Sequence, residues 1–231
     1  MTSVELGAVV AQTLAQLGVA GVVTGVGSRN APLSMAFHRL DADGTVPLHV
    51  VLDERSAAFR ALGLAKATGK LAAVAVTSGS AVANLHPAVL EARHAGVPML
   101  VLTADRPMEL VGSGASQTAD QVGIFGPSVL GTVRLSSNSG DGAAWSAAVQ
   151  RAAHLALGTR TREPGPVQVN LEFTPPLVGQ TPTPDVHVAH VSASRGDDIV
   201  ELSGTNNTVV MVGEARPSVG AEARALAELA G

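Results

Sequence analysis

Short apolar runs alternate with amphipathic stretches over the first 171 residues of the chain. A continuous apolar run of roughly four to eight residues is typical of a strand that is covered on both faces. Six strands are predicted, at about 19–26, 46–52, 71–76, 98–103, 129–135 and 166–171. Helices are predicted at about 3–17, 32–40, 54–67, 80–94 and 143–157. This alternation indicates an α/β fold with a doubly wound, mainly parallel six-stranded sheet and helices on both faces.

The pattern changes near residue 180. Six prolines lie between residues 164 and 184, and the following stretch has no regular period. We therefore predict one domain at 1–180, a linker at 181–205 and the beginning of a second α/β unit at 206–231. One strand and one helix cannot bury a core of their own, so we expect the chain to be the N-terminal piece of a longer protein.

Composition narrows the possible partners of the chain. The 231 residues carry a net charge of −4, and no cluster of lysine and arginine suggests a nucleic-acid partner. The absence of cysteine excludes disulfides and thiolate metal sites. No apolar run approaches the ~20 residues that span a membrane, and the N-terminus lacks the basic segment of a secretion signal. We expect a cytoplasmic protein without a membrane span.

Glu54 is the first candidate for chemistry. It follows the apolar strand at 46–52 directly, and ligands of an open parallel sheet bind outside the carboxyl ends of its strands. A structural alternative is equally simple, because Asp53 and Glu54 would occupy the first turn of a helix, where negative charge is favourable by ~0.3–1 kcal/mol. Position alone leaves both interpretations open.

Other polar groups follow neighbouring strands and should share this edge of the sheet. They are Ser28-Arg29-Asn30, Thr77-Ser78-Gly79-Ser80 and Asp105-Arg106-Pro107. The serines, the threonine and Asn30 could be helix caps, and the arginines could pair with Asp53 or Glu54 in a plain ion network. Together, however, two arginines at one edge are suited to a ligand that carries carboxylates.

Five segments of the chain carry a family resemblance. They are Gly27-Ser-Arg-Asn-Ala-Pro-Leu33, Asp53-Glu-Arg55, Thr77-Ser-Gly-Ser-Ala-Val-Ala-Asn-Leu85, Leu102-Thr-Ala-Asp-Arg-Pro-Met-Glu-Leu110 and Gly114-Ala-Ser-Gln117. In this order they resemble the N-terminal part of the 2-succinyl-5-enolpyruvyl-6-hydroxy-3-cyclohexene-1-carboxylate synthases, thiamine-diphosphate enzymes of menaquinone biosynthesis. The resemblance covers essentially all of residues 1–180.

The resemblance implies a pyrimidine-binding domain at 1–180, the start of a middle domain from 206, and a homodimer or dimer of dimers. It implies a transferase that decarboxylates 2-oxoglutarate and adds the resulting succinyl carbanion equivalent to isochorismate. Glu54 would be the catalytic glutamate, which hydrogen-bonds the aminopyrimidine of the cofactor and promotes its imino tautomer. Ser28, Arg29, Arg106 and Gln117 would bind substrate, and Glu54, Ser78 and Gly79 would bind cofactor.

The resemblance also implies thiamine diphosphate and Mg²⁺ as cofactors, with the metal and diphosphate ligands beyond residue 231. Gly140-Asp-Gly142 with Asn170 imitates a metal motif of the superfamily. Asn170 lies inside a predicted strand, however, and Gly142 precedes a helix, so we predict no metal ligand in this chain. Ser116 stands where asparagine is usual, which affects the interpretation of Gln117.

Three interpretations remain from sequence. The first is the synthase fragment, which we expect to be inactive by itself. The second is the equivalent domain of another thiamine-diphosphate lyase or decarboxylase. The third is a noncatalytic binding module of the same fold, for which a carboxylate at position 54 would serve no purpose.

Overall fold

The computed structural model describes residues 1–189 and residue 191. A six-stranded sheet in the order β2-β1-β3-β4-β6-β5 forms its centre, and all neighbouring strands are parallel. The strands are β1 (Val22–Thr24), β2 (Leu48–Val50), β3 (Ala72–Val76), β4 (Met99–Asp105), β5 (Thr132–Ser136) and β6 (Pro166–Glu172). The predicted fold class is confirmed.

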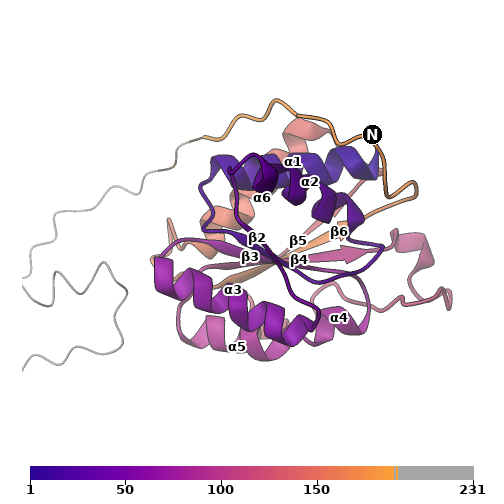
Figure 1. Cartoon of the computed structure of the whole chain (residues 1–231). Helices are drawn as coiled ribbons and strands as arrows, with labels where there is room; N and C mark the ends of the chain where they lie inside the picture. Colours follow the sequence, from indigo (N-terminus) through magenta and orange to yellow (C-terminus); the bar gives the residue numbers. More distant parts are fainter. Residues whose placement is uncertain (190, 192–231) are drawn as a thin grey trace, which may run out of the picture.

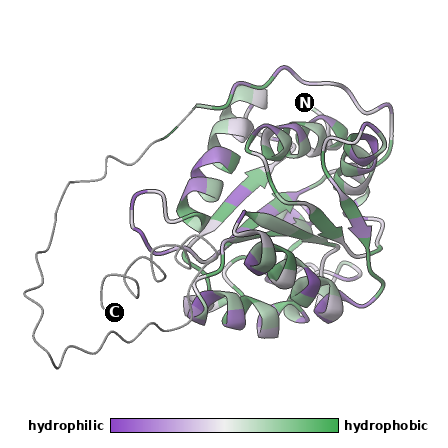
Figure 2. Cartoon of the chain, turned by 60° about the vertical axis from the view of Figure 1, so that its left-hand side comes forward, coloured by the Kyte–Doolittle hydropathy of each residue, from purple (hydrophilic) through white to green (hydrophobic). Residues whose placement is uncertain are grey.

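Two helical layers cover the sheet, as Figure 1 shows. The first layer contains α1 (Ser3–Gln16), α2 (Ala31–Ala42) and α6 (Gly142–Ala156). The second contains α3 (Glu54–Thr68), α4 (Ser80–Ala83) and α5 (His86–His94). Each layer forms its own apolar cluster with one face of the sheet. Figure 2 shows strands that are largely green but are interrupted by hydrophilic residues. The buried side of α3 consists of alanines alone, so an aromatic-poor sequence still closes a packed core.

The helix boundaries follow from local chemistry. Thr2 and Glu5 form a capping box at the start of α1, and Gly18 follows its end with a φ of 70°. The single helix predicted at 80–94 is wrong, because the structure has two helices, α4 and α5. Pro87 lies in the first turn of α5 and has no N–H with which to continue the ladder from α4.

The segment between β4 and β5 contains two short 3₁₀ helices, η1 (Met108–Leu110) and η2 (Gly126–Ser128). It passes the loop after β3, to which Gln117 and Gln121 are bonded, and η2 then contacts α5 before β5 begins. The fifth strand starts at Thr132, three residues later than predicted, and residue 129 instead packs against the second helical layer.

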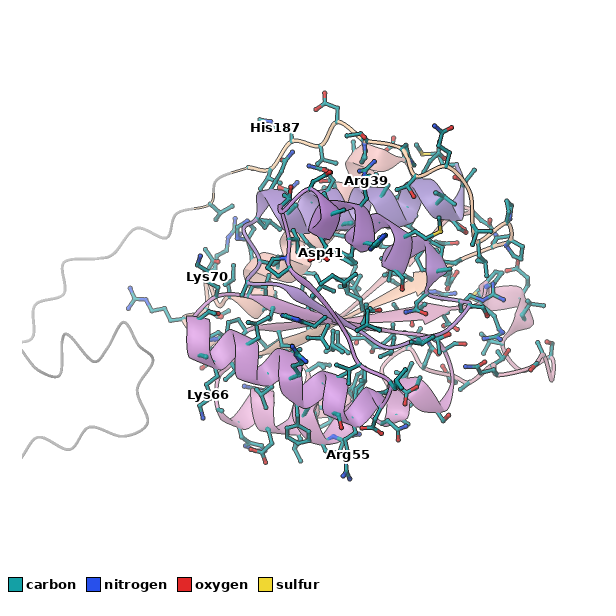
Figure 3. All side chains as sticks on the ribbon, viewed as in Figure 1. Arg39, Asp41, Arg55, Lys66, Lys70 and His187 are labelled. Atoms are coloured by element: carbon teal, nitrogen blue, oxygen red, sulfur yellow. The ribbon has the colours of Figure 1, made fainter. Side chains whose placement is uncertain are left out.

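Residues 181–189 lie against the first helical layer. Arg39 of α2 donates from Nη1 to the carbonyl oxygen of Pro182 at 2.8 Å, and Gln150 of α6 donates from Nε2 to that of His187 at 2.8 Å. Figure 3 shows Arg39 beneath this segment and His187 on it. The first part of the predicted linker is thus in contact with the domain. The remainder of the linker and the predicted unit at 206–231 lie outside the described residues.

No helix in the described part of the chain is long and apolar enough to cross a membrane.

Candidate functional site at the carboxyl edge of the sheet

The parallel register brings the carboxyl ends of the strands to one edge. Ser28 and Arg29 follow β1, Glu54 follows β2, Ser78 and Gly79 follow β3, and Arg106 follows β4. Gln117 reaches the same edge from the long connection after β4, where its side chain contacts the backbone of Ser78. The structure therefore brings the sequence-predicted site residues to the side of an open α/β sheet where ligands bind.

Glu54 is the first residue of α3, and Asp53 caps that helix by accepting from the Ser56 N–H at 2.7 Å. This hydrogen bonding from Ser56 lowers the pKa of Asp53 below its ordinary value. Glu54 takes no part in the cap. Its Oε2 accepts one long hydrogen bond, 3.4 Å, from Asn84 Nδ2, and its Cγ lies 3.5 Å from where a Cβ on Gly25 would stand. The carboxylate therefore lies beside the ends of β1 and β3, and among the described residues its other oxygen accepts no hydrogen bond.

Arg106 joins two loops. Its Nη1 donates to the Gln117 carbonyl oxygen at 2.7 Å and to Ser78 Oγ. The two loops also bond each other directly, because Gln117 Nε2 donates to the Ser78 carbonyl oxygen at 2.9 Å. Gln117 has a φ of 55°, a left-handed conformation that costs energy for a residue with a side chain. The contacts to Arg106 and Ser78 hold it there.

Arg29 lies half-buried and donates from Nη1 to the Phe173 carbonyl oxygen at 2.6 Å. Burial lowers its pKa, the neighbouring charge of Arg106 lowers it further, and Asp105 opposes both. Within residues 1–189, neither arginine forms an ion pair with Asp53 or Glu54, so the predicted alternative of a plain ion network is not found. Two guanidinium groups that repel each other at one edge favour an anionic ligand.

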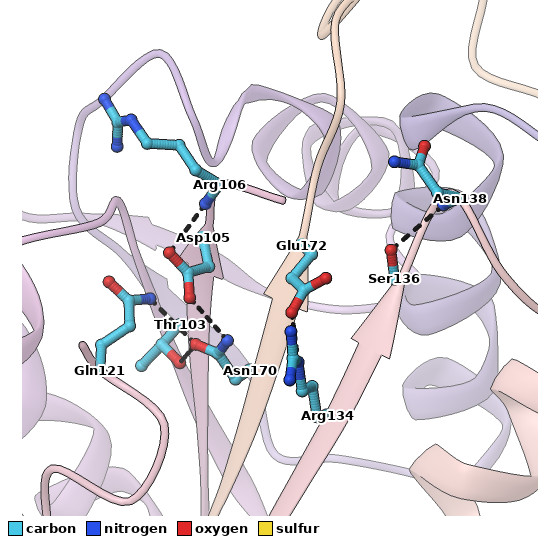
Figure 4. Close-up of polar contacts among 9 residues, drawn as sticks. All are labelled: Thr103, Asp105, Arg106, Gln121, Arg134, Ser136, Asn138, Asn170 and Glu172. Atoms are coloured by element: carbon cyan, nitrogen blue, oxygen red, sulfur yellow. Dashed lines mark hydrogen bonds and ion pairs between the residues drawn. The ribbon is translucent and has the colours of Figure 1, made fainter. Parts of the chain in front are cut away.

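Asp105, the last residue of β4, is only 2% exposed. Its Oδ1 accepts from the Arg106 backbone N–H at 2.8 Å, and its Oδ2 accepts from Asn170 Nδ2 at 2.8 Å (Figure 4). Burial raises the pKa of Asp105, the hydrogen bonds from Asn170 and Arg106 oppose this, and Glu172 adds to it. A buried carboxylate thus fixes the backbone that carries Arg106.

The capping alternatives for the other polar residues are not found. Asn30 occupies the N-cap position of α2, but its side chain does not cap the helix and donates to the Gly25 carbonyl oxygen at 2.9 Å. Gly79 occupies the equivalent position of α4, which has no side-chain cap. Asn30 and Ser78 therefore hold the site loops instead of the helix ends.

The imitation of a metal motif has a structural explanation. Asp141 caps α6 by accepting from the Ala144 N–H at 2.8 Å, and Asn170 lies in β6 with its amide bonded to Thr103 and Asp105. Within residues 1–189, no group of three or more histidine and acidic side chains is arranged to hold a metal ion.

The sequence-based prediction did not identify the polar residues of β6 as part of the site. Gln168, Asn170 and Glu172 alternate with apolar residues in a strand whose positions are all buried. A parallel strand covered on both faces is normally apolar throughout, so this alternation was the available signal of a buried polar network.

The loops around Glu54 approach one another closely. A Cβ on Gly27 would stand 2.4 Å from Thr77 Cβ, so glycine is needed at that position, whereas a Cβ on Gly25 would meet Glu54 Cγ at an ordinary 3.5 Å. Among the described residues, Oε1 of Glu54 accepts no hydrogen bond, so it would fit a ligand that offers a protonated ring nitrogen, as the pyrimidine of thiamine diphosphate would.

Comparison with known proteins agrees with this geometry. Residues 4–124 match the family model described as "Thiamine pyrophosphate enzyme, N-terminal TPP binding domain", thiamine pyrophosphate being another name for thiamine diphosphate. The chain is also similar to several curated proteins named 2-succinyl-5-enolpyruvyl-6-hydroxy-3-cyclohexene-1-carboxylate synthase. Identity is 48% to that of Kineococcus radiotolerans, over 99% of this chain and 42% of the relative. It is 47% to that of Rhodococcus erythropolis, over 78% and 33%, and 42% to that of Mycobacterium marinum, over 89% and 40%.

The chain spans less than half the length of these relatives, and what it resembles is their N-terminal part. The family match covers more than half of the chain, and the six-stranded parallel sheet with a glutamate after β2 is the architecture that the family resemblance implied. The chain therefore belongs to the family of N-terminal TPP binding domains of thiamine pyrophosphate enzymes.

Proposed function

We propose that this chain is the pyrimidine-binding part of a 2-succinyl-5-enolpyruvyl-6-hydroxy-3-cyclohexene-1-carboxylate synthase. Such an enzyme would decarboxylate 2-oxoglutarate and transfer the succinyl unit to isochorismate in the cytoplasm, for menaquinone biosynthesis. Similarity at 42–48% identity over most of the chain supports the proposal. The observation that carries it is Glu54, whose carboxylate lies beside the end of β1 and has one oxygen without a hydrogen bond among the described residues.

Glu54 is the proposed catalytic residue. Bound thiamine diphosphate would supply a carbon centre able to decarboxylate a 2-oxo acid and transfer the remainder. Glu54 would hold a proton at a nitrogen of the cofactor's pyrimidine ring. Its backbone is fixed by β2 and by the Asp53 cap, so the carboxylate is preorganised for that hydrogen bond.

The arginines are the proposed substrate-binding groups. Arg29 and Arg106 lie near enough for the charge of one to lower the pKa of the other, and isochorismate carries carboxylates. Binding a dianion would relieve this repulsion, with Ser28 and Gln117 as neighbouring polar contacts. Arg106 would keep its bond to Gln117 and offer its remaining N–H groups to the substrate.

The cofactor would also contact the loop after β3 at Ser78 and Gly79. The diphosphate and the Mg²⁺ ion would bind to groups beyond residue 231, and a second subunit of a homodimer or dimer of dimers would supply the facing surface. We therefore expect the 231-residue chain alone to be inactive.

The test uses the complete protein, by which we mean this chain together with the remainder of the proposed synthase. It is incubated with thiamine diphosphate, Mg²⁺, 2-oxoglutarate and isochorismate, and the succinylated product and CO₂ are measured. The proposal predicts both products in equal amounts, and none from the 231-residue chain. CO₂ release from another 2-oxo acid without use of isochorismate would indicate a different thiamine-diphosphate lyase, and failure to bind the cofactor would indicate a noncatalytic module.

A further inference from the structure

Two buried amides lie behind the candidate site. Gln121, from the connection between η1 and η2, is 0% exposed and has all of its polar atoms engaged. Its Oε1 accepts from the Gly79 N–H at 3.2 Å, and its Nε2 donates to the Ala104 carbonyl oxygen at 3.0 Å and to Asn170 Oδ1 at 2.9 Å. One side chain thus links the loop after β3 to the ends of β4 and β6.

Asn170 continues the connection toward the arginines. It is also 0% exposed, and its Oδ1 accepts from Thr103 Oγ1 at 2.8 Å as well as from Gln121. Its Nδ2 donates to Asp105 Oδ2 at 2.8 Å, and Asp105 Oδ1 accepts from the Arg106 backbone N–H (Figure 4). An unbroken series of hydrogen bonds therefore runs from Gly79 to Arg106 through the interior.

We propose that Gln121 and Asn170, here called the amide pair, are positioning residues of this site. Gln121 sets the position of Gly79, and Asn170 sets that of Arg106 through Asp105. The inference rests on the proposed function in one respect, namely that Gly79 faces the cofactor and Arg106 faces the anionic substrate.

The direction of the hydrogen bonds explains why these positions carry amides. Position 121 must accept from one backbone N–H and donate to two oxygens at once, which a carboxylate cannot do and an apolar side chain cannot do at all. Gly79 has a φ of 80°, and a Cβ there would come within 3.0 Å of Gln117 Cγ, so only glycine suits this position of the loop. Removing the acceptor of its N–H leaves a buried donor without a partner, which favours movement of the loop.

The test compares two variants of the complete protein, Gln121→Met and Asn170→Leu, each of similar size to the native residue. The dissociation constant of thiamine diphosphate with Mg²⁺ is measured by calorimetry, and the KM for isochorismate by turnover. Gln121→Met is expected to weaken cofactor binding by roughly tenfold, the effect of one to two lost hydrogen bonds, and to change the KM less. Asn170→Leu is expected to change the KM for isochorismate more than it changes the dissociation constant of thiamine diphosphate.

Val149→Ala is the matched control, because it opens a cavity in the buried face of α6, in the apolar cluster on the other face of the sheet from α4. It should lower the unfolding temperature while leaving both constants at their wild-type values. If Gln121→Met fails to fold, the isosteric Gln121→Glu replaces it. This variant keeps an acceptor atom but loses both donors that hold the side chain against Ala104 and Asn170, so the acceptor is no longer fixed in front of the Gly79 N–H. Weaker binding of thiamine diphosphate is the expected result for whichever of the two Gln121 variants is used.

Constants equal to those of Val149→Ala in both amide variants would overturn the inference and leave the proposed function intact. If the wild-type complete protein makes no succinylated product, the proposed function fails, and the calorimetric constant alone decides the inference. In that case weaker cofactor binding by Gln121→Met supports it, and binding equal to the control overturns it.

Discussion

Two corners of the carboxyl edge are built in opposite ways. At the glutamate corner, made by Gly25, Glu54 and Asn84, one long hydrogen bond of 3.4 Å is the only side-chain contact of the carboxylate among the described residues. At the arginine corner, made by Ser78, Arg106, Gln117 and Gln121, every loop is bonded to another.

The difference shows which part of the site has its geometry fixed by contacts among the described residues. The arginine corner has its geometry fixed by internal contacts, including a residue held in a costly backbone conformation. The glutamate corner leaves a charged acceptor available and depends on a ligand to use it. Substitutions at the two corners should therefore have different effects. A substitution at the glutamate corner should lower the rate of the reaction, and one at the arginine corner should weaken substrate binding.

The largest effect is expected for Glu54→Gln in the complete protein. Removing a proton-transfer group should lower kcat by ~10²–10⁴-fold, whereas losing a helix-terminal charge costs only ~0.3–1 kcal/mol of stability. Turnover and urea unfolding measured on the same preparation check both numbers. A parallel loss of stability and activity would remove the distinction between the corners.

The next effect concerns the two arginines. Arg29→Ala and Arg106→Ala should each raise the KM for isochorismate by ~10- to 100-fold, since a guanidinium–carboxylate contact contributes ~1.5–3 kcal/mol. Lysine at either position should restore only part of this, because a point charge cannot replace a bidentate fork. Steady-state kinetics at saturating cofactor provide the measurement, and an unchanged KM in both alanine variants would mean that the arginines only hold the loops.

A smaller effect on stability is expected when the two aspartates that cap helices are replaced, and it distinguishes a capping role from a role in metal binding. Asp53→Ala and Asp141→Ala each remove an equivalent cap, with hydrogen-bond distances of 2.7 and 2.8 Å, and each should lower the free energy of unfolding. Neither substitution should change the affinity for Mg²⁺ in the complete protein. Urea unfolding and metal titration test this, and loss of Mg²⁺ binding in Asp141→Ala alone would restore the metal interpretation of Gly140-Asp-Gly142.

The smallest expected effect is a dependence of the free energy of unfolding on pH, caused by Asp105 beside the arginine corner. Because burial raises the pKa of Asp105 above its ordinary 3.8, the folded protein binds this proton more tightly than the unfolded chain. The resulting stability is fully present below pH 3.8 and is lost as the pH rises through the raised pKa. Relative to Asp105→Asn, wild type should lose stability with increasing pH, as urea unfolding at several pH values would show. Parallel curves would mean that the native carboxylate has an ordinary pKa.

The sequence was most informative where one residue decides a local structure. The capping box at Thr2 and the glycine after α1 are such local features, since each depends on neighbours within four residues. The strand–helix alternation predicted the parallel sheet, and the parallel sheet in turn placed Glu54 and Arg106 at one edge. A single proline in the first turn of α5 was enough to make one predicted helix into two.

The arginine corner could not be predicted in detail, because its contacts join residues distant in sequence. Gln121 meets Asn170 across 49 positions and Gly79 across 42, and nothing local marks it. The position of β6 between β4 and β5 creates that meeting, and strand order is set by the packing of the whole sheet. The polar alternation in β6 was a usable signal, but it identifies a buried network without identifying its partners.

The central claim is that Glu54 acts on the cofactor. Its most direct test is deuterium exchange at the thiazolium carbon of thiamine diphosphate bound to the complete protein, compared between wild type and Glu54→Gln at equal cofactor occupancy. We expect much slower exchange in Glu54→Gln, by ~10²-fold or more, because the proton at the ring nitrogen is no longer held. Equal exchange rates at equal occupancy would contradict it and would leave Glu54 as a helix-terminal charge.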